Sequence, residues 1–231
     1  MMKEGLLEKI QSVGFWRVNI RPVTPLRKAL SFQRCNEVVE RASVSIRGWD
    51  FPHISRRNDA SGGRGNMGDY AESWTDWEGF HEFWRMYRSG QFIFIGLLHE
   101  DTEEWGNGAP AGTFLNTVSA IYSIAEFVEF SRRMSDVNLF PSGISIDISL
   151  NNSAGRALSV GRGRMPFFEK KVNGAQRIQL KGDFSIDEIT QRSRDISIDF
   201  DLELFDYFGW NPDRSQIAGD QDKFFRKEFS W

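Results

Sequence analysis

A short run near residue 50 gathers an indole ring, a carboxylate, an imidazole and two guanidinium groups within nine residues. These groups belong to Trp49, Asp50, His53, Arg56 and Arg57. Arginines beside aromatic rings suit the recognition of phosphate groups and nucleobases. Together with Arg47, which comes just before it, this run is the first candidate binding surface.

The same run can also be explained as a structural corner. Gly48 can supply the turn and Pro52 can fix the exit of the chain, while the rings of the run fall back into the core. The acid and the imidazole would then bond to local backbone groups. The sequence favours a corner, with Arg56 and Arg57 behind it as the residues to test for function.

A second candidate surface lies in the last third of the chain, where residues 156–181 carry seven basic residues and one acid. Cations with rings between them suit a nucleic-acid backbone and its bases. Residues 183–206, however, carry eight acids and two arginines. Their negative charge could cancel the electrostatic field of the basic stretch beyond a Debye length, which is about 8 Å. Binding and intramolecular neutralisation both stay open. The basic residues proposed for binding are Arg162, Arg164, Lys170 and Lys171.

A third pattern would suit a metal-dependent nuclease. Asp147 lies on the polar side of an alternating segment, and Glu169 and Lys171 follow it. Two carboxylates can hold Mg²⁺ while a lysine orients water or stabilises charge, provided that both acids lie on adjacent strands. We keep this as the alternative to a protein that has no catalytic residue, metal ion or cofactor.

Other patterns favour structural roles. The three histidines are far apart and show no zinc-ligand spacing, and the single Cys35 excludes an internal disulfide. We find no nucleotide-binding glycine motif or nucleophile elbow. Glu126 and Glu129, one turn apart, are expected on the solvated edge of a helix.

The composition is that of a globular protein of 231 residues, 40% hydrophobic and 26% charged. The net charge of −3 argues against duplex nucleic acid as the main partner. No segment has the character of a signal peptide or is apolar for long enough to span a bilayer. We therefore expect a cytoplasmic protein with no membrane partner.

Apolar alternation and continuous apolar runs predict the strands that must position these residues. Their ranges are 15–23, 43–47, 91–98, 144–150 and, more weakly, 175–181. Because 91–98 is apolar on both faces, we expect it at the centre of a sheet, with 144–150 at an edge or half exposed.

Helical periodicity and capping residues predict the helices. Their ranges are 2–13, 24–42, 75–89, 113–134 and a last segment opened by a capping box at Ser185. In 196–208 strand-like alternation competes with a helical face, and we favour the helix. These elements predict one α+β domain over 1–231, with a mixed or antiparallel sheet packed by amphipathic helices and a mobile Gly-rich loop at about 58–73.

Four fragments resemble the C-terminal region of bacterial proteins that carry an N-terminal Schlafen-type Alba domain, which binds ATP or DNA. They are GFWRVNIRP at 14–22, IRGWDFPHI at 46–54, FWRMYRSGQFIFI at 83–95 and LFDYFGW at 204–210. We expect no Alba-like domain upstream, so the resemblance does not carry over the activity of that domain. It implies a bacterial accessory module in regulation or antiviral defence.

The function predicted from these observations is non-catalytic recognition of a protein partner or of nucleic acid through a basic and aromatic surface. That surface combines the 47–57 run with the basic residues of 156–181. The alternative is the Mg²⁺-dependent nuclease built on Asp147, Glu169 and Lys171.

Overall fold

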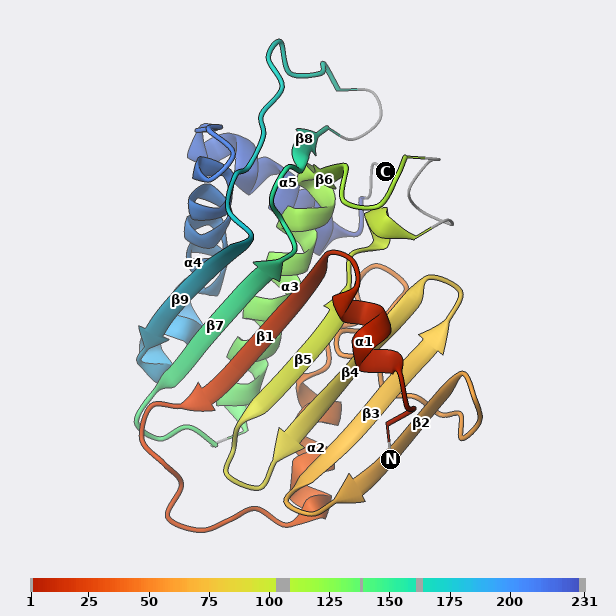
Figure 1. Cartoon of the computed structure of the whole chain (residues 1–231). Helices are drawn as coiled ribbons and strands as arrows, with labels where there is room; N and C mark the ends of the chain where they lie inside the picture. The colour runs from red at the N-terminus through yellow and green to blue at the C-terminus, as the bar shows by residue number, and fades with distance from the viewer. Residues whose placement is uncertain (1, 103–108, 138, 161–163, 229–231) are drawn as a thin grey trace.

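Seven antiparallel strands form the main sheet of this α+β protein, shown in a computed structural model (Figure 1). The structure describes residues 2–102, 109–137, 139–160 and 164–228. The strand order is β2-β3-β4-β5-β1-β7-β9. The strands are β1 (Phe15–Pro22), β2 (Gly62–Met67), β3 (Tyr70–Trp77), β4 (Phe80–Tyr87), β5 (Phe92–Leu97), β7 (Ile144–Asn151) and β9 (Arg177–Phe184).

The helices divide unequally between the two faces of the sheet. The short first helix, α1 (Leu6–Gln11), crosses the front of the sheet in Figure 1, and the later helices lie behind it. Two short parallel strands, β6 (Phe114–Asn116) and β8 (Ala157–Ser159), pair beyond the end of the main sheet, near a one-turn 3₁₀ helix at His99–Asp101. The helices are α1 (Leu6–Gln11), α2 (Phe32–Ala42), α3 (Thr117–Asp136), α4 (Ile186–Asp206) and α5 (Arg214–Arg226).

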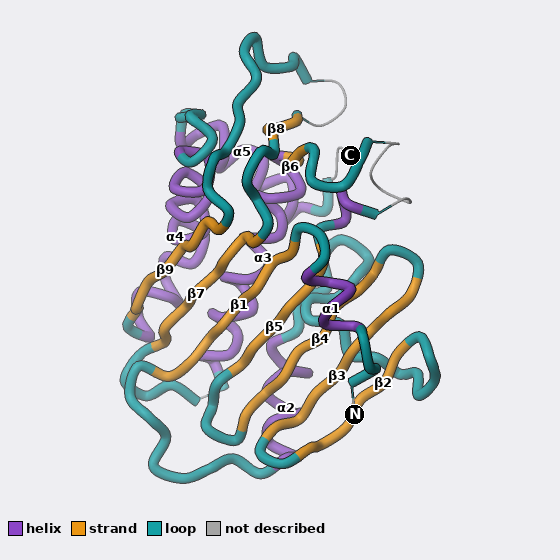
Figure 2. The backbone as a smooth tube through the Cα atoms, in the orientation of Figure 1, coloured by secondary structure: helices purple, strands orange, loops and turns teal. Residues whose placement is uncertain are grey.

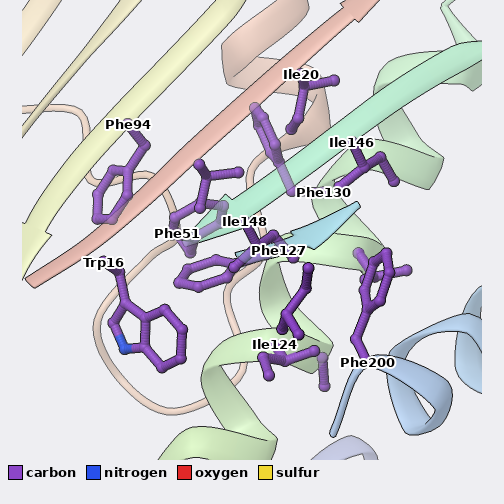
Figure 3. Packing of buried hydrophobic residues seen from close by; sticks show 14 of the residues in the cluster. Trp16, Ile20, Phe51, Phe94, Ile124, Phe127, Phe130, Ile146, Ile148 and Phe200 are labelled. Carbon is purple, nitrogen blue, oxygen red and sulfur yellow. The ribbon is translucent and has the colours of Figure 1, made fainter. Parts of the chain in front are cut away.

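The main core lies between the sheet and α3, and aromatic rings fill much of it (Figure 3). The ring of Phe51, which comes from the corner, packs 4.8 Å from both Phe94 on β5 and Phe127 on α3. Rings of this size contribute most of the apolar burial in a core. A smaller cluster on the front face joins Leu6 and Ile10 of α1 to residues of the sheet.

Several predictions from periodicity are confirmed. The segment that is apolar on both faces is β5, the central strand of seven. Ser185 opens α4 with a capping box shared with Glu188, and residues 196–206 continue that helix. The predicted strand at 144–150 is β7, but it lies between β1 and β9 rather than at an edge.

The predicted helix at 75–89 is wrong, because this segment is the β3–β4 hairpin. Glu78 and Gly79 both have positive φ, 40° and 80°, as the two central residues of a tight hairpin turn require. The spacing of the aromatic residues fits a helical stripe as well as a strand. Residues 80–87 form a strand because they pair with β3 on one side and with β5 on the other.

The Gly-rich stretch at 58–73 is also not simply a loop, since it holds β2 and the start of β3. Glycine is required at position 63, where a Cβ atom would lie 2.8 Å from the Trp74 indole nitrogen. A glycine strand can thus lie flat against a neighbouring ring.

Three further boundaries differ from the prediction. Residues 43–47 form no strand, and only Val44 pairs, in a single bridge to Phe51. Helix α2 begins after Ser31, whose hydroxyl accepts from the Arg34 N–H, rather than at Thr24. Helix α3 begins after Asn116 rather than at Thr113, because the Asn116 side chain accepts two backbone N–H groups. Residues 23–31 run instead as part of a long loop (Figure 2).

Within the described ranges, none of the helices combines the length and the apolar character needed to cross a bilayer.

Candidate functional site

The run at 47–53 is a corner held from both sides. Val44 and Phe51 exchange two backbone hydrogen bonds of 2.7 and 2.9 Å, and Gly48 turns the chain with φ 88°. Phe51 enters the core, as the corner interpretation predicted. The bridge fixes where the side chains between its two ends can lie.

Trp49 does not follow Phe51 into the core. Its ring stacks between His53, with ring centroids 4.0 Å apart, and Phe80, at 3.9 Å. Its indole N–H donates to Glu82 Oε1 at 3.1 Å. The Trp49 side chain therefore separates two hollows and lines both of them.

The first hollow, which we call the acid pocket, has a volume of about 630 Å³. It lies between α3 and the ends of β1, β4 and β5, and this size is typical of small-molecule sites. Its apolar lining is mostly aromatic. The rings are those of Trp16, Trp49, Phe51, Phe80, Phe94, Phe114 and Phe127. Its charged and titratable lining residues are Arg47, Asp50, Glu82, His99, Glu100 and Glu126.

Arg47 and Glu126 form a bidentate ion pair in this pocket. The Nε–Oε1 distance is 3.0 Å and the Nη2–Oε2 distance is 2.5 Å, and only 3% of the Glu126 side chain is exposed. Burial raises the pKa of Glu126, and the Arg47 charge opposes that shift. The predicted solvated edge of α3 is therefore wrong for Glu126, while Glu129 pairs with Arg132 and Arg133.

Two other groups of the pocket have altered pKa values because they are removed from water. Desolvation raises the pKa of Glu82 to about 7, against the hydrogen bond from Trp49. Desolvation also lowers the pKa of His99 to about 4, so this imidazole is neutral at pH 7. Perturbed titratable groups in a ring-lined pocket are typical of functional sites.

Glu100 is a further buried acid of the pocket. Its Oε1 accepts the Asn116 backbone N–H at 3.1 Å, whereas Oε2 is buried with no hydrogen-bond partner among the described residues. Burial raises the pKa of this carboxyl. A buried polar atom without a partner is rare in folded proteins and calls for an explanation.

The second hollow, which we call the arginine groove, has a volume of about 680 Å³ and lies between α2, the corner and strands β2 and β3. Arg56, Arg57 and Arg64 line it and are exposed. The Arg57 guanidinium lies 5.1 Å from the centre of the Trp77 ring and donates to Ser61 Oγ at 3.0 Å. Trp49, Asp50 and His53 border this groove as well.

The described basic residues of 156–181 do not join this groove, and no described residue of 164–181 lines either hollow. Arg164 is bound to Asp220 through two short contacts, of 2.6 and 2.5 Å. Lys170 is exposed and Lys171 is half-buried, both in a loop outside the sheet. Arg162 lies outside the described residues.

The nuclease alternative requires Asp147 and Glu169 to lie on adjacent strands, and they do not. Asp147 is on β7, where its two oxygens accept from Gln179 Nε2 at 2.8 and 3.0 Å. Its Oδ2 also lies 3.7 Å from Lys181 Nζ. Glu169 lies in a bend rather than on an adjacent strand, in the same loop as Lys171. The described residues contain no group of three or more His, Cys, Asp or Glu side chains that could hold a metal ion.

Sequence reasoning missed Glu82, Glu100 and Phe80 as lining residues. The predicted helix at 75–89 contains Phe80 and Glu82, whereas the hairpin turns both toward the corner. A signal was present in Phe80, Glu82 and Trp84, which alternate and would put an acid between rings on one face of a strand.

No protein-family model, curated protein or solved structure matches this chain. The resemblance to the C-terminal region of Schlafen-type proteins therefore stays a prediction. The same holds for the role in bacterial regulation or antiviral defence that it implies.

Proposed function

We propose that this protein is a non-catalytic recognition module that binds single-stranded nucleic acid in the arginine groove. The proposal rests on three arginines of this groove that have no described carboxylate as an ion-pair partner. Arg56, Arg57 and Arg64 line one groove, and no described carboxylate lies within 4.0 Å of their charged nitrogens, whereas Arg47 and Arg164 are already paired.

The rings beside these cations favour a single strand over a duplex. Trp77 and the stacked Trp49–His53 pair border the groove, and exposed base faces stack on such rings. Bases inside a duplex are not available for this contact. The net charge of −3 also argues against a broad field that attracts duplex DNA.

The acids of the groove limit the strength of binding. Glu40 and Asp50 line it together with the three arginines, so we expect contact with a short stretch of backbone. Single strands release about 0.7 counterions per phosphate contacted, so three contacts give a log–log salt slope of about −2.

The test is a fluorescence anisotropy titration of a labelled oligonucleotide at several salt concentrations. We expect Arg56→Ala, Arg57→Ala and Arg64→Ala each to weaken binding and each to make the salt slope shallower by about 0.7. Lys170→Ala is the matched control, because this exposed cation lies outside the groove.

Stacking is tested separately with Trp77→Leu. Loss of one stacked base costs about 1–3 kcal/mol, so we expect this change to weaken oligonucleotide binding about tenfold or more. It should leave the affinity for a sulfated oligosaccharide, which has no bases, nearly unchanged. Equal binding by the arginine variants and the parent, or equal losses for both polyanions, would show that the proposal is wrong.

A further inference from the structure

The acid pocket is a second site, with chemistry opposite to that of the arginine groove. Asp50, Glu82, Glu100 and Glu126 face one guanidinium, that of Arg47. Arg47 makes a bidentate pair with Glu126, and no second cation is among the described lining residues for the other three carboxyls. The charge of Arg156 acts on Glu100 from outside the lining, but Arg156 is itself paired with Asp101. An occupant with N–H groups and positive charge would supply what is missing.

Glu100 shows where such a group would bind. It lines the pocket, is 7% exposed, and has an oxygen, Oε2, with no hydrogen-bond partner among the described residues. Its other oxygen is held by the Asn116 backbone at the start of α3, so the carboxyl group has a fixed position. A buried acceptor without a donor calls for an explanation, and the N–H group of a ligand in the pocket would supply one.

The aromatic rings that line the acid pocket indicate what the remainder of the ligand should be. Trp16 and Phe127 meet edge to face with centroids 5.8 Å apart, and Phe80 stacks on Trp49. Ring faces attract cations most strongly where water is excluded, and they also pack on flat apolar groups. A volume of about 630 Å³ has room for both a charged head and an apolar body.

We propose that the acid pocket binds a small organic cation, a protonated amine or amidinium on a flat apolar body, and that Glu100 accepts a hydrogen bond from its N–H group. The proposal does not rest on nucleic-acid binding in the arginine groove, although Trp49 and Asp50 line both hollows. An anionic ligand would place its charge against the carboxyls. A metal ion would need a ligand cluster that the described residues do not contain.

The experiment compares three probes of one shape by isothermal titration calorimetry. They are 2-phenylethylamine, the neutral 2-phenylethanol and the anionic 3-phenylpropanoate. We expect the amine to bind at least about tenfold more tightly than the alcohol, a difference of about 1.4 kcal/mol, and the anion not to bind.

Glu100→Gln tests the assigned acceptor, because it keeps the shape and the oxygen that caps Asn116 but removes the charge. It should weaken the amine about tenfold and leave the alcohol within about twofold. Glu169→Gln, an exposed acid in a loop, is the matched control and should change neither affinity.

Ser119→Phe provides a second test that does not touch any carboxyl. Ser119 is half-buried on α3 and lines the pocket, so a ring there should fill the space and abolish binding of all probes, with the circular dichroism spectrum unchanged. The proposal is overturned if the amine does not bind at millimolar concentration or binds no better than the alcohol. It is also overturned if folded Glu100→Gln keeps the affinity of the parent, or if Ser119→Phe still binds the amine.

Discussion

Buried carboxylates are the least usual residues of this protein, and their neighbours decide what each one does. Glu126 is paired with Arg47, whereas Asp201 on α4 has no exposed surface and no hydrogen-bond partner for either oxygen among the described residues. Burial, and then the charge of Asp220, raise the pKa of Asp201 well above its ordinary value. Folding therefore shifts the Asp201 carboxyl toward its protonated form.

This gives a pH-dependent prediction for Asp201→Asn. A carboxyl whose pKa is higher in the folded than in the unfolded state lowers the free energy of unfolding as pH rises above the unfolded pKa of 3.8. Asparagine does not titrate, so Asp201→Asn does not lose stability in this way. The free energy of unfolding of the variant should exceed that of the parent by little near pH 4 and by more toward pH 8. We expect it to exceed about 1.4 kcal/mol there, the free energy of one pKa unit.

Urea denaturation of parent and variant at pH 4, 6 and 8 measures this difference. Asp206→Asn is the control, since that residue is exposed on the same helix. A constant difference between Asp201→Asn and the parent across this range would contradict the prediction.

The β3–β4 hairpin is the element that places Phe80 and Glu82 beside the corner, and its turn contains a strained residue. Glu78 has φ 40°, a conformation that costs most residues about 1–2 kcal/mol, while asparagine tolerates it better. Asn-Gly is the preferred pair for such a two-residue turn.

We therefore expect Glu78→Asn to stabilise the protein by about 0.5–1 kcal/mol, because it relieves the backbone without changing the register of the strands. Thermal unfolding followed by circular dichroism checks this. Glu169→Asn, at an exposed position without positive φ, should leave the midpoint unchanged. An unchanged or lower midpoint for Glu78→Asn would mean that the turn gains nothing from asparagine.

Across the molecule, the two hollows share one wall. Trp49 and Asp50 line both, one hollow rich in arginine and the other in carboxyls. The two proposed sites thus share the same stacked ring.

The shared wall predicts that Trp49→Ala weakens oligonucleotide and amine binding together, each by about tenfold, because the ring stacked between His53 and Phe80 holds the linings of both hollows in position. Arg57→Ala should affect the oligonucleotide alone, and Glu100→Gln the amine alone. Parallel titrations of the three variants, with the fold checked by circular dichroism, test this. Loss of only one activity in Trp49→Ala would show that the ring serves a single hollow.

The elements that could be predicted are those whose sequence pattern agrees with their environment. The central strand β5 is apolar on both faces because it is covered on both, and Ser185 caps α4 through a residue only three positions away. The β3–β4 segment could not be assigned in this way, because its rings fit two periodicities and only strand pairing separates them.

The site was predictable only in part for a related reason. The corner and its arginines are contiguous in sequence, so their types and spacing indicated a surface. The Arg47–Glu126 pair joins residues 79 positions apart, and Arg164–Asp220 joins residues 56 apart. No local pattern shows which cations such partners will neutralise.

The short helix α1 has a practical consequence for the binding measurements. It packs on the face of the sheet that carries Trp74, while Thr75 and Trp77 on the same strand turn toward the arginine groove on the opposite side. The N-terminus lies beside α1 (Figure 1). Protein tethered to a sensor chip through an N-terminal tag should therefore present the arginine groove to the flowing solution, away from the support.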